Sequence, residues 1–132
     1  MPQSWVKVYV HVPDQPMVRQ VDGRNFENPL QSVLGVIDKL KGYGVGVVGN
    51  YDNVAMIISG EGVYRAIPGS GAVPSAGQTG AMHREPEKIV VFSAPKDALS
   101  VLLRELKQNH PYETPVIDII DLVRHEFDCL AP

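Results

Sequence analysis

The sequence predicts an α+β fold in which two helices cover one face of a four-stranded antiparallel sheet. Three observations predict it. Two stretches have the apolar spacing of amphipathic helices, four stretches are short and rich in β-branched residues, and the two kinds alternate along the chain. The order βαββαβ is the split βαβ, or ferredoxin-like, arrangement. Right-handed crossovers place both helices on the same face of the sheet.

The composition is typical of one packed domain. The chain has 132 residues, of which 44% are hydrophobic and 20% are charged. We expect a single domain over residues 1–132, with a core of about 4–123 and a C-terminal tail over 124–132. Twelve Lys and Arg against fifteen Asp and Glu provide no basic excess for binding nucleic acid. A single cysteine, Cys129, excludes an internal disulfide.

No stretch has the pattern of a signal peptide or the length of a membrane span. We therefore expect a cytoplasmic protein with neither a membrane nor a nucleic acid as its partner.

The first strand is predicted at residues 5–12, where valines alternate with other residues, as in a strand with one face on a core. The opposite face of this strand carries Trp5, Tyr9 and His11. A bare aromatic face on a small domain is typical of an interface, so we expect a homo-oligomer, either a trimer or a dimer. Residues 14–27 have no sustained period and are predicted to be a loop.

Capping residues mark both helices. Asn28 precedes a proline and a helical apolar stripe, which predicts a helix at about 29–41 that stops at the following glycines. The second helix follows Ser93-Ala94-Pro95 and ends at Asn109.

The remaining strands are predicted at 54–59, 88–92 and 116–123. Gly60-Glu61-Gly62 is interpreted as a tight hairpin whose returning arm, residues 63–67, is an extra element beside the sheet. Residues 68–80 hold four glycines and are predicted to be a loop.

Both helix-to-strand connections are expected at the same end of the sheet. This arrangement would bring residues 49–52 beside residues 110–113, with the glycine-rich loop 68–80 entering from that end too. We therefore expect the three segments to converge.

These segments carry motifs that resemble one family. The motifs are Gly49-Asn50-Tyr51-Asp52, Gly60-x-Gly62 with Tyr64-Arg65, Gly71-Ala72-x-Pro74-x-x-Gly77-x-x-Gly80, and His110-Pro111-Tyr112-Glu113. In this order they resemble the inserted middle domain of the NIF-three-like (NGG-interacting factor three-like) proteins, over roughly residues 45 to 122. The resemblance implies a fold like that of the trimeric CutA and PII proteins, with association through the sheet. The resemblance implies no metal site from the host proteins here, because that site lies in a flanking domain outside the region of resemblance.

The candidate ligand-binding residues are Asn50, Tyr51, His110, Tyr112 and Glu113. His110 with Glu113, and His83 with them, also form a candidate divalent-metal site. The alternatives are structural: residues 110–113 as a helix exit, and residues 50–52 as a turn held by Asn and Asp side chains. A phosphate-binding role for the glycine-rich loop is disfavoured, because its glycines precede a strand and it has no lysine.

The sequence shows no catalytic set of nucleophile, base and orienting residue. We therefore predict a non-enzymatic, oligomeric binding or regulatory domain with no cofactor. The alternatives are a CutA-like protein that binds a divalent metal and, less favoured, a small hydrolase with His110 as general base.

Overall fold

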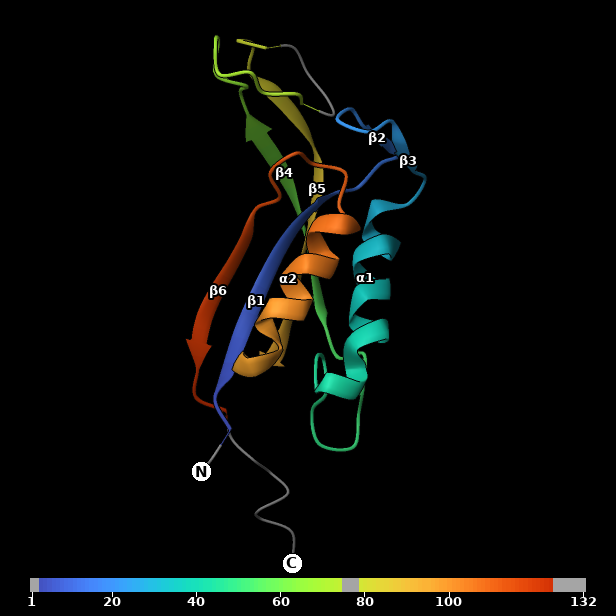
Figure 1. The fold of residues 1–132 in the computed structure, drawn as a ribbon, viewed down its shortest axis with the longest axis vertical. Helices are drawn as coiled ribbons and strands as arrows, with labels where there is room; N and C mark the ends of the chain where they lie inside the picture. Colours follow the sequence, from blue (N-terminus) through green and yellow to red (C-terminus); the bar gives the residue numbers. More distant parts are fainter. Residues whose placement is uncertain (1–2, 75–78, 125–132) are drawn as a thin grey trace, which may run out of the picture.

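Two helices cover one face of a four-stranded antiparallel sheet with the order β4-β5-β1-β6 (Figure 1). This computed structural model describes residues 3–74 and 79–124; the predicted tail from residue 125 on, with Cys129, lies outside them. The elements of this layer are β1 (Trp5–Pro13), α1 (Pro29–Leu40), β4 (Met56–Tyr64), β5 (His83–Pro95), α2 (Leu99–Gln108) and β6 (Ile117–Leu122). Short 3-10 turns, Lys41–Tyr43 and Lys96–Ala98, end α1 and precede α2. The predicted fold class is confirmed.

The core lies between the sheet and the helices. The alternate valines of β1 are completely buried, and the apolar stripes of α1 and α2 pack over them through residues such as Ile37, Leu102 and Leu106. Each such side chain stabilises the fold by about 1.5–3 kcal/mol relative to exposure. The predicted cap is also present, since Asn28 accepts a hydrogen bond from the backbone N–H of Gln31.

Residues 14–27 differ from the predicted loop. They form a small antiparallel hairpin of β2 (Met17–Arg19) and β3 (Arg24–Phe26), with Gly23 in the left-handed region at φ 71°. Strands of three residues are too short to show a period in the sequence. Arg19 and Arg24 instead anchor this hairpin to the end of α2, a contact between distant residues.

The predicted tight hairpin at residues 60–62 is wrong. The β4 strand runs straight through these glycines and pairs with β5 from Met56↔Val91 to Tyr64↔His83. Neither Gly60 nor Gly62 has the positive φ of a hairpin turn. Because β1 pairs with β5 only as far as Glu87, β4 and β5 continue together beyond the sheet as an arm, residues 61–64 with 83–86 (Figure 1).

The two helix-to-strand connections lie at opposite ends of the sheet, so this part of the predicted convergence is wrong. Every neighbouring pair of strands is antiparallel, so β4 and β6 run in opposite directions and the chain enters them from opposite ends of the sheet. The α1 helix leads to the start of β4, and α2 leads to the start of β6 (Figure 1).

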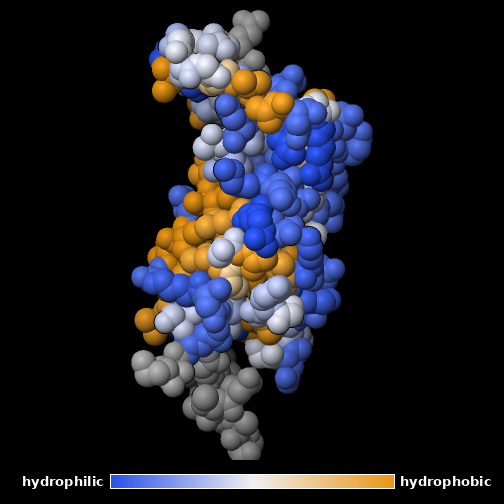
Figure 2. Space-filling model, viewed as in Figure 1, coloured by the Kyte–Doolittle hydropathy of each residue, from blue (hydrophilic) through white to orange (hydrophobic). Residues whose placement is uncertain are grey.

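Apolar residues are exposed beside the helices on the side of the sheet that the helices cover (Figure 2). Figure 2 shows hydrophobic residues gathered beside α2, over β6 and the neighbouring part of the sheet. In residues 3–74 and 79–124, no helix has both the length and the apolar character required to cross a membrane.

Candidate functional site at the base of the arm

A groove of about 460 Å³ lies where the arm leaves the sheet, on the face opposite the helices. This volume is within the usual range for small-molecule sites. Its floor comes from β1, β4 and β5, and its rim comes from residues 112–116 and Pro74. The lining residues are His11, Gly60, Glu61, Gly62, Val63, Tyr64, Pro74, Glu87, Ile89, Tyr112, Glu113, Thr114 and Val116.

Two glutamates of β5, Glu85 and Glu87, hold Tyr112 in place in this groove. The hydroxyl of Tyr112 donates to Glu85 and lies 3.0 Å from a carboxylate oxygen of Glu87. The Glu85 side chain is only 1% exposed, so its charge depends on partners within the protein. This contact ties the connector after α2 to the first part of β5.

Further side chains complete the network around the two carboxylates. His11 Nδ1 lies 3.1 Å from Glu87, and His83 Nε2 lies 3.3 Å from Glu85. Gln15 donates a third hydrogen bond to Glu85 at 3.2 Å. Residues from three separate parts of the chain, namely the region at the end of β1, the start of β5 and the connector after α2, therefore meet at one pair of carboxylates.

The lack of a side chain at Gly62 leaves space for the carboxylate of Glu87. A Cβ atom at Gly62 would clash with a carboxylate oxygen of Glu87, so a side chain there would displace that carboxylate. At Gly60, two residues earlier on the same face, a Cβ would meet nothing within 4 Å and would point into open space. The first glycine borders the empty groove, whereas the second lies beneath Glu87.

Both tyrosines of the groove keep their phenolic protons at ordinary pH. Burial, assisted by the nearby charge of Glu85, raises the pKa of Tyr64 to about 12. Burial, followed by the hydrogen bond to Glu85 and the charge of that carboxylate, raises the pKa of Tyr112 still further above its usual value. Both phenols are therefore hydrogen-bond donors to carboxylates and do not act as bases.

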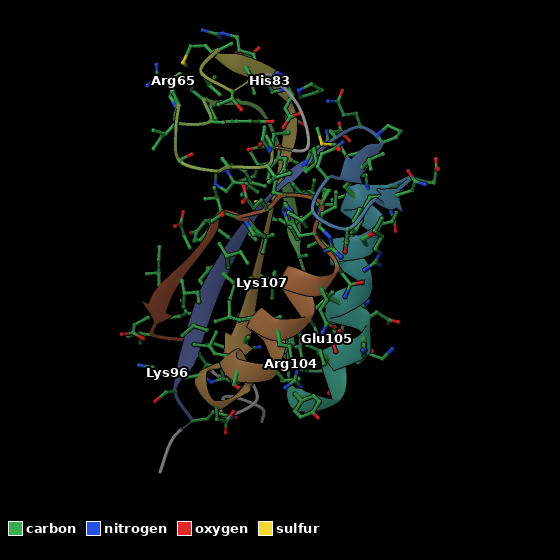
Figure 3. The ribbon with its side chains drawn as sticks, turned by 45° about the horizontal axis from the view of Figure 1, so that its top comes forward. Arg65, His83, Lys96, Arg104, Glu105 and Lys107 are labelled. Atoms are coloured by element: carbon green, nitrogen blue, oxygen red, sulfur yellow. The ribbon has the colours of Figure 1, made fainter. Side chains whose placement is uncertain are left out.

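Aromatic rings run in a row from the arm to the connector. The ring of Tyr64 lies 5.0 Å from His83 and 6.0 Å from Tyr112, and Tyr112 lies 5.0 Å from His110, measured between centroids. Figure 3 shows His83 on the arm, near Arg65, with Lys96 at the opposite end of the molecule. The two histidines of the predicted metal site are thus at the two ends of this row.

His110 is a structural residue. It is completely buried, its Nδ1 accepts from the backbone N–H of Tyr112 at 3.1 Å, and its Nε2 lies 2.5 Å from the carbonyl oxygen of His11. A neutral imidazole with its proton on Nε2 satisfies both contacts. Burial lowers its pKa to about 4. Because neither nitrogen is free, His110 does not fit the predicted roles of ligand contact, metal ligand or general base.

The other predicted site residues divide between the two ends. Tyr112 and Glu113 both line the groove, and Glu113 accepts a hydrogen bond of 2.9 Å from the backbone N–H of Val73. The glycine-rich loop therefore does meet the connector. Asn50 and Tyr51 lie at the other end, where Tyr51 is 75% exposed in a turn against Val48.

The predicted metal site is not assembled. In residues 3–74 and 79–124, no group of three or more His, Cys, Asp or Glu side chains could hold a metal ion. His83 pairs with Glu85, Glu113 accepts from the glycine-rich loop, and His110 contacts the backbone of His11. The three side chains therefore do not converge on one point where a metal ion could bind.

Sequence reasoning missed Glu85 and Glu87, which are the centre of the network. The signal was present as a period of two, because His83, Glu85, Glu87 and Ile89 share one face of a strand. The predicted strand, residues 88–92, begins after these charged residues, whereas β5 begins at His83.

Solved structures identify the class of this fold. The divalent ion tolerance protein CutA1 from Ehrlichia chaffeensis matches with a TM-score of 0.58 at 16% identity, over 100% of both chains. CutA1 from Pyrococcus horikoshii matches with a TM-score of 0.57 at 19% identity, over 95% of this chain and 90% of that one. The chain is therefore a ferredoxin-like domain of the CutA type in its fold.

The sequence relatives are longer proteins. The chain is 35% identical over 95 residues to a Mycobacterium leprae protein named "GTP cyclohydrolase 1 type 2 homolog", covering 72% of this chain and 24% of that protein. The protein of the same name from Mycobacterium tuberculosis is 35% identical over 80 residues, 61% of this chain and 21% of that one. The chain thus spans about a quarter of the length of these relatives. No family model matches it.

A Bacillus cereus protein related to NIF3 also contains this fold. It matches with a TM-score of 0.66 at 21% identity, over 92% of this chain and 26% of that one. Together with the sequence relatives, it confirms the resemblance to a NIF-three-like domain with a CutA-like fold.

Proposed function

We propose that this chain is a non-enzymatic, homo-oligomeric binding domain that takes a small ligand in the groove at the base of the arm. The observation that supports it most directly is the groove itself, which combines about 460 Å³ of space with polar side chains held in place by a buried network. Preformed concave sites with a few oriented polar groups are typical of ligand binding.

The absence of catalysis is part of the proposal. The hydrolase alternative requires His110 as a base, and the lone pair of that histidine already accepts from Tyr112. The two phenols of the groove are held protonated by their raised pKa values.

Homo-oligomerisation is supported by the sheet face that carries the groove. Apolar side chains cross this face on three neighbouring strands: Met56 and Ile58 of β4, Ile89 and Val91 of β5, and Tyr9 of β1. Met56 and Ile58 are 64% and 44% exposed. A continuous apolar surface of this kind favours cover by another protein surface, for which we propose a second copy.

The divalent-metal alternative has the CutA likeness in its favour but no ligand cluster among residues 3–74 and 79–124. The groove therefore supports an organic ligand better. A cytoplasmic location stays a prediction.

The proposal is tested with a variant, Gly60→Leu, whose new side chain occupies part of the groove. A panel of nucleotides, amines, carboxylates, small anions and divalent metals is screened by ligand-observed NMR against the wild-type protein and Gly60→Leu. The leucine occupies open space at a position without a left-handed backbone, so the fold is retained. We expect at least one compound to bind the wild type and to lose binding in Gly60→Leu.

The matched control is Gly35→Leu, on the exposed face of α1, where a Cβ also meets nothing within 4 Å. It should bind like the wild type. A panel without any binder, or a binder that Gly60→Leu retains, would contradict the proposal.

A further inference from the structure

The lining of the groove is acidic. It contains Glu61, Glu87 and Glu113, and none of its described residues is a lysine or an arginine. We infer that the ligand is a small organic cation, an ammonium group on an apolar body. This inference rests on the proposed function, because it assigns a ligand class to the same groove.

The three carboxylates do not contribute equally. Glu61 is paired with Arg84 at 2.5 Å, so its charge is already compensated at the surface. Among the described residues, Glu87 has hydrogen-bond contacts with His11 and Tyr112, and Glu113 accepts from the backbone N–H of Val73. A carboxylate has about four acceptor sites, so both keep capacity for a further donor. Glu87 and Glu113 are the groups that would receive an ammonium.

The tyrosine rings favour the same sign of charge. Tyr64 and Tyr112 both line the groove, with their centroids 6.0 Å apart. Aromatic faces attract cations, and Glu85 and Glu87 already disfavour negative charge on the two phenols. An anionic ligand would be repelled by these carboxylates and would find no lysine or arginine among the described lining residues, while the ring of His11 already lies beside Glu87.

A bare metal ion fits this lining poorly. Much of the wall is apolar, from Val63, Pro74, Ile89 and Val116. The described residues also contain no group of three or more side chains that could ligate a metal. A ligand that combines an ammonium with hydrocarbon satisfies the carboxylates and covers the apolar wall at once.

Three probes of similar shape test the inference: 2-phenylethylamine, 2-phenylethanol and 3-phenylpropanoate, which are cationic, neutral and anionic at pH 7. Dissociation constants are measured by NMR titration of the full chain. We expect the amine to bind about tenfold more tightly than the alcohol and the carboxylate to bind least, because a charge-assisted hydrogen bond is roughly twice as strong as a neutral one.

Equal affinities, or a preference for the alcohol or the carboxylate, would overturn the inference while leaving the proposed function intact. The inference is also overturned, and the proposed function kept, if none of the three probes binds but another compound of the panel binds the wild type and not Gly60→Leu. If no panel compound binds at all, the proposed function fails as well.

Charge-removing variants place the effect in the groove. Glu113→Gln keeps an oxygen for Val73, and Glu87→Gln keeps one for His11. Each should lower the ratio of amine to alcohol affinity, by about tenfold for the more buried Glu87. The control Asp97→Asn, beside Lys96 at the opposite end (Figure 3), should leave the ratio unchanged. A ratio unchanged in both groove variants overturns the inference, and Glu113→Gln decides alone if Glu87→Gln does not fold.

Discussion

His110 illustrates how burial changes the role of a titratable residue. The motif His110-Pro111-Tyr112-Glu113 offers an imidazole and a carboxylate close together in the sequence, as many functional sites do. In the structure the imidazole faces the core and joins the carbonyl of His11 to the backbone of Tyr112. It holds the connector against β1, and Tyr112 is thereby directed at the carboxylates of β5.

This role predicts a particular loss of stability in acid. The pKa of His110 is lowered to about 4 in the folded protein, whereas its ordinary value is 6.5. The unfolded chain therefore binds a proton first as the pH falls, and the free energy of unfolding decreases between pH 6.5 and 4. The shift corresponds to about 3 kcal/mol. Urea unfolding at a series of pH values measures it.

The control for this measurement is His110→Gln, whose amide offers one acceptor and one donor but does not titrate. Its stability should change less than that of the wild type between pH 6.5 and 4. Parallel curves for the two proteins would show that other groups cause the acid loss.

At the scale of elements, the β2–β3 hairpin is a cap for α2. Arg19 donates to the backbone carbonyls of Lys107, Gln108 and His110, and Arg24 donates to that of Gln108. The last carbonyls of a helix have no partners within it and carry partial negative charge, so two guanidinium groups stabilise this end. Asp22 orients Arg19, and this hydrogen bond lowers the pKa of Asp22 to about 2.

Removing this cap should loosen the end of α2. We expect Arg19→Ala to lower the free energy of unfolding by about 1.5–3 kcal/mol, the usual contribution of hydrogen bonds to a charged group. Amide hydrogen exchange in the last turn of α2 should also become faster. Arg104→Ala removes the same charge from the exposed side of α2 (Figure 3) and should change neither quantity.

At the scale of the whole molecule, the open face of the sheet, which is the face opposite the helices, determines whether the domain associates with other copies. Ile57 and Ile58 are adjacent on β4 and almost equally exposed, at 45% and 44%. Their registers place Ile58 opposite Ile89 on the open face and Ile57 opposite Val90 on the helix side. They are therefore a matched pair for testing which face associates.

We expect the wild-type chain to sediment as a dimer or trimer and Ile58→Asp to sediment as a monomer, because the new carboxylate would be buried without a partner in the interface. Ile57→Asp should keep the oligomer. Analytical ultracentrifugation gives the mass of each. A wild-type monomer, or dissociation by both variants alike, would contradict association through the open face.

The sequence alone determined the elements with clear periods. The alternating valines of β1 and the stripes of α1 and α2 define which side of each element is apolar, and those sides can meet only in one layer. Asn28 with Pro29 marked the start of α1 for a local reason, since capping involves neighbouring residues. The motifs around Tyr112 and Glu113 also pointed to a true part of the groove.

Only the tertiary structure decided what depends on contacts between distant residues. The strand directions placed Tyr51 and Tyr112 at opposite ends, and the partner strand made Gly60 and Gly62 part of a straight β4. Burial made His110 structural, while Glu85 and Glu87 acquired their role from residues up to 76 positions away, such as His11. Hydrogen bonds and desolvation act through space, so a local pattern cannot show which side chains will share them.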